Sequence, residues 1–405
     1  METRLYDPAE HRPLDGRAWS EAEARAAIEA IAGDAITAYR GPEELWPNAL
    51  ADLEDDPDQP FRGVYLGAAG LAWALSVLAR DGLAPELPGV AELADSLPEG
   101  FRRAPELLRW ATPPAPSLLF GESGILLAVE AIRGAGEHLA DLEACITGNA
   151  RNPTLETCWG SPGTMLAALA MWRGTGEERW RRAWLESAEG LLAQWRETVW
   201  VQDLYGETRR FTGAGHGFAG NAFALLGGRD LLGDRAGEVT ARIRGVFCDI
   251  AVEEDGVAQW LPLFGAEQAR RPLQWCHGSP GIVISLAGLP ADEETDRLLS
   301  AGAELTWRAG PLVKGAGLCH GTAGNAYALL ALYARSGEER WLERARMFAM
   351  DAVADVDRRR VAEGRGRYTL FTGDVGVALL LRSCLGADAS FPFLAAPLLS
   401  TGGQI

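Results

Sequence analysis

The residues that could do chemistry are histidines and cysteines gathered in one part of the chain. Three of the five histidines and two of the six cysteines lie immediately before or beside the first glycine in three consecutive copies of a repeated motif, as His216, the pair Cys276-His277 and the pair Cys319-His320. Two thiolates and one imidazole are a ligand set that suits Zn²⁺. Three protein ligands would leave the fourth tetrahedral position open for substrate. We therefore expect one catalytic zinc ion here.

The two Cys-His pairs occupy matching positions, because each cysteine stands two residues before the first glycine of a Gly-x-x-Gly motif. Cys276 and Cys319 are therefore expected to lie together. For the third ligand we favour His320 over His277, although spacing alone does not decide between them. Two alternatives stay open: a disulfide between the cysteines, and thiols that are buried simply as small apolar side chains.

A repeated motif must position these residues. Seven copies of Gly-x-x-Gly, each followed by an apolar stretch of helical character, run along the chain, with first glycines at Gly67, Gly121, Gly160, Gly217, Gly278, Gly321 and Gly373. Each interval can hold two helices of ordinary length. Glycine permits a positive φ and a close backbone approach just before a helix begins. We expect seven inner helices whose N-termini point toward a common centre.

A second repeated string marks the outer helices. Gly-Glu-Glu-Arg-Trp occurs at 176–180 and again at 337–341, each time 16 residues after a first glycine. It opens an amphipathic segment, at 180–199 and at 341–356, with charged residues on one side as an outer helix requires.

Other parts of the chain agree with a helical protein. Residues 20–40 are expected to form a helix, and Ser20 and Glu23 have the spacing of a capping box. Strand-like alternation is brief, around 252–263, where glycines and prolines interrupt it.

We therefore predict an all-α protein, an α/α toroid with about seven inner and seven outer helices. Closure into a ring removes the need for the polar end repeats that an open solenoid requires. As domains we expect an N-terminal helical segment at 1–62 that packs on the toroid, and the seven-repeat toroid itself at 63–405.

Composition excludes several classes of protein. The 405 residues are 47% apolar and carry a formal net charge of −18, with a pI of about 4.8. An acidic chain is a poor partner for nucleic acid or an anionic membrane. No apolar run is long enough for a transmembrane helix. The charged start is unlike a signal peptide, and six cysteines are too few for a disulfide scaffold, so we expect a cytoplasmic protein.

The motifs around these residues resemble the lanthionine synthetase C-like (LanC-like) family. The resemblance rests on WCHGSPG at 275–281, GLCHGTAGNAYAL at 317–329 and GHGFAG at 215–220. It implies a two-ring toroid with a single zinc ion in its centre. It further implies zinc ligation by three residues that match the family's ligands, Cys276, Cys319 and His320.

The resemblance also implies a reaction. The zinc would favour the thiolate of a substrate, which adds to dehydroalanine or dehydrobutyrine and forms a lanthionine-type thioether. His216 matches the family's acid/base histidine, and its ordinary pKa near 6.5 suits protonation of the resulting enolate. The plainer interpretation of His216 is a packing histidine.

Departures from the bacterial peptide cyclases bear on the substrate. Pro272 and His277 stand where those cyclases tend to carry Arg and Tyr, so the chain looks more like the LanC-like proteins of eukaryotes that add glutathione. Lys314 matches a lysine that those proteins use near the bound thiol or a phosphate leaving group. We expect Lys314 and His277 to contact substrate. Thr372 departs from the pattern, because the family commonly has Glu there.

The predicted function is thus zinc-dependent addition of a thiol, from a peptide cysteine or from glutathione as co-substrate, in lanthipeptide-type chemistry. The partner is a dehydrated peptide, and a separate dehydratase or kinase would supply it, because the repeats fill the chain. One alternative is a non-catalytic LanC-like scaffold or sensor that binds zinc and a thiol peptide. A less favoured one is a toroidal glycoside hydrolase that uses Glu122 and Asp374.

Overall fold

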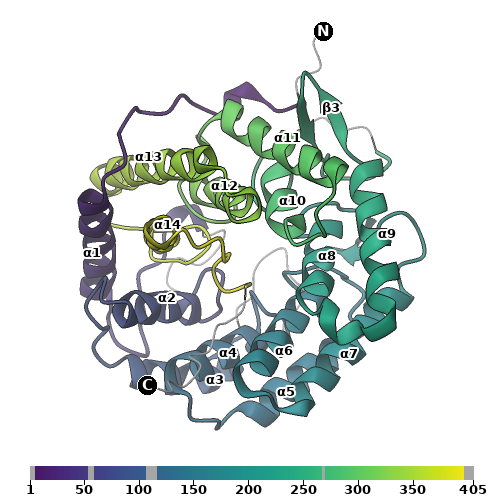
Figure 1. Ribbon diagram of the computed structural model, residues 1–405. Helices are drawn as coiled ribbons and strands as arrows, with labels where there is room; N and C mark the ends of the chain where they lie inside the picture. The colour runs from purple at the N-terminus through teal and green to yellow at the C-terminus, as the bar shows by residue number, and fades with distance from the viewer. Residues whose placement is uncertain (1–4, 53–58, 106–115, 267–269, 396–405) are drawn as a thin grey trace.

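The computed structural model describes residues 5–52, 59–105, 116–266 and 270–395. The described residues form fourteen α-helices in two concentric rings, with two short β-hairpins (Figure 1). The predicted all-α toroid with about seven inner and seven outer helices is therefore confirmed.

The inner helices begin where the sequence motif predicts. In each of the seven, the first glycine of a motif is the N-cap, and most of the helix that follows is buried on all sides. All eight residues of α10, for example, are buried. The inner helices are α2 (Ala68–Arg80), α4 (Glu122–Arg133), α6 (Ser161–Thr175), α8 (Phe218–Gly227), α10 (Ser279–Leu286), α12 (Thr322–Ser336) and α14 (Asp374–Gly386).

The second glycine of each motif allows a close backbone contact. A Cβ at Gly124 would lie 1.8 Å from the carbonyl oxygen of Leu118, and a Cβ at Gly281 would lie 1.8 Å from that of Trp275. The carbonyl six residues earlier is within clashing range in all seven copies. Glycine also permits a positive φ, but six of the first glycines have negative φ, and only Gly278 has a positive one, 106°. The shared requirement of the seven motifs is therefore the close contact between the second glycine and the carbonyl oxygen six residues earlier.

The outer helices cover the inner ring, and two of them differ in length from the prediction. The helix predicted to reach residue 199 ends at Ala193, and the helix predicted to end at 356 continues to Glu363. Within this extension, Asp355 forms ion pairs with Arg358 at 3.2 Å and Arg359 at 2.8 Å, a spacing that stabilises a helix. The outer helices are α1 (Glu21–Ala38), α3 (Val90–Arg103), α5 (Leu139–Asn149), α7 (Glu178–Ala193), α9 (Ala236–Asp249), α11 (Glu293–Ala309) and α13 (Glu339–Glu363).

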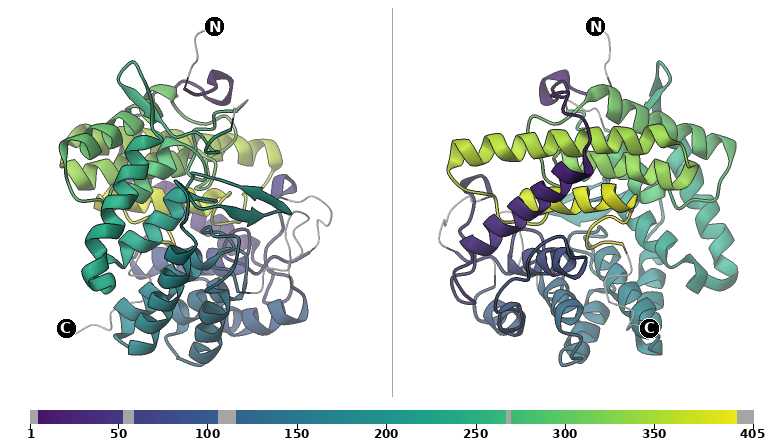
Figure 2. Two further views of the ribbon diagram at one scale, coloured as in Figure 1. Left: turned by 90° about the vertical axis from the view of Figure 1, so that its right-hand side faces the viewer. Right: turned by 60° about the vertical axis from the view of Figure 1, so that its left-hand side comes forward.

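The N-terminal segment crosses the outside of the ring. Ser20 caps α1 by accepting a hydrogen bond from the backbone N–H of Glu23 at 3.3 Å, as the sequence predicts. Helix α1 packs against α14 (Figures 1 and 2). Ahead of it, Arg12 forms an ion pair with Asp351, a fully buried carboxylate of α13.

The loops that carry the motifs are hydrogen-bonded to one another around the ring. In each link, a backbone N–H of one loop donates to a carbonyl of the next, at 2.9–3.3 Å: Gly215 to Cys276, Cys276 to Cys319, Cys319 to Phe371, Phe371 to Tyr65, and Tyr65 to Leu119. The hydroxyl of Thr157 joins a further loop by donating to the Ala214 carbonyl at 3.0 Å. The loops therefore form one connected layer at the N-terminal ends of the inner helices.

The strands are short, and the weak alternation around 252–263 does form one hairpin of two strands. Hairpin β3–β4 pairs Val252–Glu254 with Val257–Gln259, and hairpin β1–β2 pairs Gln202–Leu204 with Glu207–Arg209. In the described ranges, no helix combines the length and the apolar character needed to cross a bilayer.

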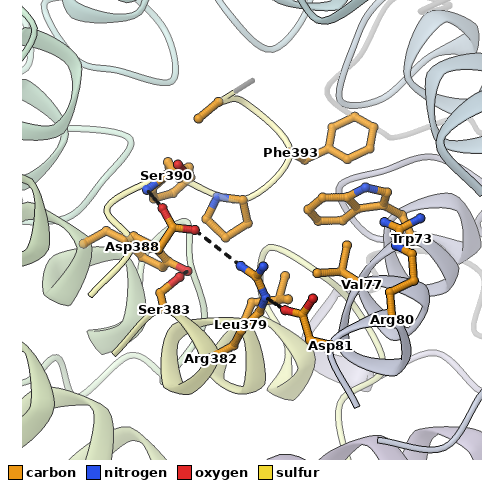
Figure 3. Close-up of a pocket in the computed structure, with 14 residues that line it drawn as sticks. Trp73, Val77, Arg80, Asp81, Leu379, Arg382, Ser383, Asp388, Ser390 and Phe393 are labelled. Carbon is orange, nitrogen blue, oxygen red and sulfur yellow. Dashed lines mark hydrogen bonds and ion pairs between the residues drawn. The ribbon is translucent and has the colours of Figure 1, made fainter. Parts of the chain in front are cut away.

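The C-terminal segment turns into the middle of the ring after α14 (Figure 1). Phe391 stacks on Trp275 with ring centroids 5.1 Å apart, and Phe393 packs edge-on against Trp73 at 5.1 Å. This segment and the helices α2 and α14 line a cavity of about 290 Å³ (Figure 3). Helix α2 contributes Arg80 to the lining, and helix α14 contributes Arg382. None of the predicted site residues lines this cavity.

Candidate functional site

Three of the predicted residues converge in the loop layer. One ligand atom each from Cys276, Cys319 and His320 lies within 4.8 Å of the other two. Both cysteines are free thiols, 7% and 5% exposed, and His320 is half-buried. Because zinc bonds to sulfur and nitrogen are about 2.0–2.3 Å long, donors this close can share one ion. The donor set and its spacing therefore fit Zn²⁺.

The backbone explains why thiols from different repeats meet. The N–H of Cys276 donates to the carbonyl of Cys319 at 3.3 Å, and the N–H of Cys319 donates to the carbonyl of Phe371 at 2.9 Å. Burial raises the pKa of Cys319, and a hydrogen bond from Cys319 lowers the pKa of Cys276. A metal ion binds cysteine as the thiolate, so an ion held here would release the thiol protons.

His216 lies against a buried carboxylate that sequence reasoning missed. Its Nδ1 is 2.9 Å from Oε2 of Glu156, which is fully buried. Glu156 also accepts backbone N–H groups at the start of α6, from Cys158 at 2.9 Å, from Gly160 at 3.2 Å and from Trp159. Burial lowers the pKa of His216, but the hydrogen bond and charge of Glu156 outweigh it, so the pKa lies above the ordinary 6.5.

Glu156 belongs to a second compact group of potential ligands, with Cys158 and His216, whose ligand atoms also lie within 4.8 Å of one another. The Cys158 thiol donates to the carbonyl of Gly215 at 3.4 Å, so it holds the loop that presents His216. The available sequence signal is an acidic residue just ahead of a helix N-terminus, where a carboxylate is favoured in any protein. That signal has no functional specificity.

Of the two predicted substrate contacts, His277 lies beside this group. The ring centroid of His277 is 5.6 Å from that of His216, and His277 is absent from the Cys276–Cys319–His320 group. Burial lowers the pKa of His277 to about 4, and the charge of Lys314 contributes to this lowering. Lys314 is exposed, and its carbonyl accepts a hydrogen bond from Arg359 at 3.1 Å.

Thr372 stands where the family commonly has Glu, but another residue places a carboxylate beside it. Asp52, from the 3₁₀ turn Leu50–Asp52, accepts a hydrogen bond from the Thr372 hydroxyl at 2.9 Å. Asp52 also forms an ion pair with Arg367. The N-terminal segment thus supplies a negative charge that the motif itself lacks.

The carboxylates of the glycosidase alternative are each tied to an arginine. Glu122 forms an ion pair with Arg102 at 2.5 Å, and Asp374 forms one with Arg360 at 3.3 Å. Neither belongs to a group of potential metal ligands in the described residues. The geometry of these two residues does not favour the hydrolase.

Comparisons with known proteins identify the family. A family model described as lanthionine synthetase C-like protein matches residues 62–396. The glutathione S-transferase LANCL1 of Danio rerio is 34% identical over 200 residues, which are 48% of this chain and 46% of that protein. The LanC-like protein GCL1 of Arabidopsis thaliana is 31% identical over 192 residues, 45% of this chain and 43% of that protein. The matched region thus spans less than half of each relative.

A solved structure shares the fold. Nisin cyclase superposes with a TM-score of 0.63 at 14% sequence identity, and the match covers 90% of this chain and 94% of that one. At this identity the likeness concerns the toroid alone.

Proposed function

The chain belongs to the lanthionine synthetase C-like family, and on that premise we propose that it is a zinc-dependent enzyme that adds a thiol to a dehydroalanine or dehydrobutyrine residue. The observation that carries the proposal is the convergence of Cys276, Cys319 and His320 in the loop layer that also presents His216. These three residues would hold the ion. Bound Zn²⁺ would act as a Lewis acid that favours the thiolate form of an incoming thiol.

The acid of the reaction is His216. When the sulfur bonds to the β-carbon, the electron pair of the double bond moves toward the α-carbon, and a proton must be delivered there. His216, held by Glu156 at 2.9 Å and with its pKa raised, can carry that proton near neutral pH. Glu156 keeps the imidazole in one orientation and stabilises its charge.

The substrate part of the proposal rests on His277 and Lys314. Burial keeps His277 neutral, so it can offer a hydrogen bond to a substrate amide. The exposed ammonium of Lys314 can hold a carboxylate or a phosphate. The thiol donor is a peptide cysteine or glutathione, and the name of the Danio rerio relative supports glutathione. We further propose a dehydrated peptide as partner, a separate dehydratase or kinase that produces it, and a cytoplasmic location.

Mass spectrometry tests the activity. A dehydroalanine peptide incubated with the protein and glutathione should gain the mass of one glutathione, and a peptide with its own cysteine should close a ring without a change in mass. Cys319→Ala and His216→Asn should abolish or slow this reaction. Cys384→Ala is the matched control, because Cys384 is a buried free thiol on α14 outside both ligand groups. A wild-type protein that retains metal but gives neither product would instead be the binding scaffold.

The substrate position can be tested separately, because Lys314 is the one lysine in the sequence. An amine-reactive probe can label only Lys314 and the N-terminal amine. Glutathione or a dehydrated peptide bound at the site should protect Lys314 and leave the N-terminal amine reactive. Equal labelling with and without either molecule would contradict the role of Lys314.

A further inference from the structure

Each of the two converging thiols receives a hydrogen bond from an uncharged side chain. The Nε2 amide of Gln274 donates to Sγ of Cys276 at 2.9 Å. The side chain of Tyr65 is hydrogen-bonded to that of Cys319. One amide and one hydroxyl thus point at the two sulfurs from outside the donor set.

Both donors are held in place by their surroundings. The Gln274 side chain is 8% exposed, and its own backbone N–H donates to the carbonyl of His277 at 3.0 Å, which fixes the turn around Cys276. Tyr65 packs against Phe120, with ring centroids 4.7 Å apart, and stacks on Phe371 at 5.0 Å with an angle of 12° between the planes. Neither donor can swing away without breaking buried packing.

The charge at such a site explains why donors to sulfur matter. The charges of two thiolates cancel that of a divalent cation, and a neutral imidazole adds none. A third thiolate would therefore give the mostly buried site a net negative charge. Buried charge is costly unless hydrogen bonds stabilise it. Hydrogen bonds to the ligands of a metal also tune the metal's properties.

Building on the proposed function, we propose that Gln274 and Tyr65 are positioning residues that act through Cys276 and Cys319. They draw electron density from the two thiolates, so that the site accepts a further sulfur and still favours its ionised form. Their contribution is electronic as well as geometric. Neither residue needs to touch the substrate.

Cobalt substitution gives a readout that does not depend on activity. In full-length protein loaded with Co²⁺, thiolate-to-cobalt charge-transfer absorption reports the energy of the sulfur lone pairs. Tyr65→Phe keeps the ring stacking and Gln274→Leu keeps the apolar bulk, but each removes one donor. We expect the absorption to move to longer wavelength in each variant and further in the double variant, with cobalt still bound at one per chain.

Matched controls separate this effect from general loosening of the fold. Tyr327→Phe removes a buried hydroxyl that is hydrogen-bonded to Ser383 at 3.0 Å, away from the sulfurs. Gln194→Leu removes an amide that donates to the carbonyl of Gly190 at 3.2 Å, at the end of α7. Both controls should keep the wild-type cobalt spectrum.

The pH profile of thioether formation is the second readout. Loss of a donor should make the incoming thiol harder to ionise, so the rate should fall about tenfold near neutral pH and recover at alkaline pH. A purely structural role would lower the rate equally at every pH. An unshifted cobalt spectrum in both Tyr65→Phe and Gln274→Leu would overturn the inference and leave the proposed function intact. Wild-type protein without thiolate-to-cobalt absorption would overturn both.

Discussion

Replacing Glu156 by Gln tests whether the buried carboxylate controls the protonation of His216. The substitution keeps the size of the side chain and removes its charge. A hydrogen bond to a charged partner contributes about 1.5–3 kcal/mol, and 1.36 kcal/mol corresponds to one pKa unit. The pKa of His216 should therefore fall by about 1–2 units. Burial, the largest influence on this pKa, then lowers it with only the charge of Cys276 left to raise it.

The lowered pKa of His216 should change the rate of thioether formation as well as the titration of the imidazole. If protonated His216 delivers the proton to the α-carbon, the rate declines as pH rises through its pKa. In Glu156→Gln this decline should begin about 1–2 pH units lower, and the rate at pH 7.5 should be about 10–100-fold below wild type. The assay is thioether formation followed by mass spectrometry from pH 5.5 to 9.

Nuclear magnetic resonance provides the direct titration. The chain has five histidines, so a His216→Asn spectrum identifies the His216 signal by its absence. Glu130→Gln is the matched control, because Glu130 also accepts a backbone N–H, from Gly136 at 3.0 Å, but does not contact His216. If His216 titrates at the same pH in Glu156→Gln as in wild type, the reasoning from the carboxylate is refuted.

Three further predictions concern stability and are checked by urea unfolding. Burial raises the pKa of Asp374 to about 6, above its ordinary 3.8, so its ionisation opposes folding as pH rises through this range; Asp374→Asn should stabilise the protein by about 3 kcal/mol at pH 7.5 and have no such effect below pH 4. Arg12→Ala leaves the buried carboxylate of Asp351 without its cation and should cost about 3 kcal/mol, and a loss under 1 kcal/mol would contradict this. Phe391→Ala removes a buried ring stacked on Trp275 and should cost about 3–5 kcal/mol, whereas an unchanged midpoint would show that the C-terminal segment does not stabilise the ring.

The fold could be predicted because its repeat depends on a steric requirement that one residue type meets. At Gly124 and Gly281, any side chain would collide with a carbonyl oxygen 1.8 Å away, so the glycines and the apolar stretches after them remain visible in the sequence. The positions of helix ends depend on weaker local interactions. The extension of α13 past residue 356 carries ion pairs from the buried Asp355 to Arg358 and Arg359, which periodicity does not reveal.

The site could be predicted where the residues share the phase of the repeat. Cys276 and Cys319 stand at matching positions, and the hydrogen-bonded loop layer brings them together. Glu156 and Asp52 could not be found in this way. Glu156 approaches His216 from a loop 60 residues away, and Asp52 reaches Thr372 from 320 residues away. Packing of neighbouring repeats brings Glu156 to His216, and closure of the ring brings Asp52 to Thr372. Neither pair has a counterpart in the other repeats.

X-ray absorption at the zinc edge, with metal analysis of the same purified protein, tests the central claim most directly. We expect one zinc per chain with two sulfur neighbours at about 2.3 Å and a histidine nitrogen at about 2.0 Å. One sulfur neighbour should disappear, or the zinc be lost, in Cys276→Ala and in Cys319→Ala. Protein that contains no zinc, or whose zinc has no sulfur neighbours, would contradict the account.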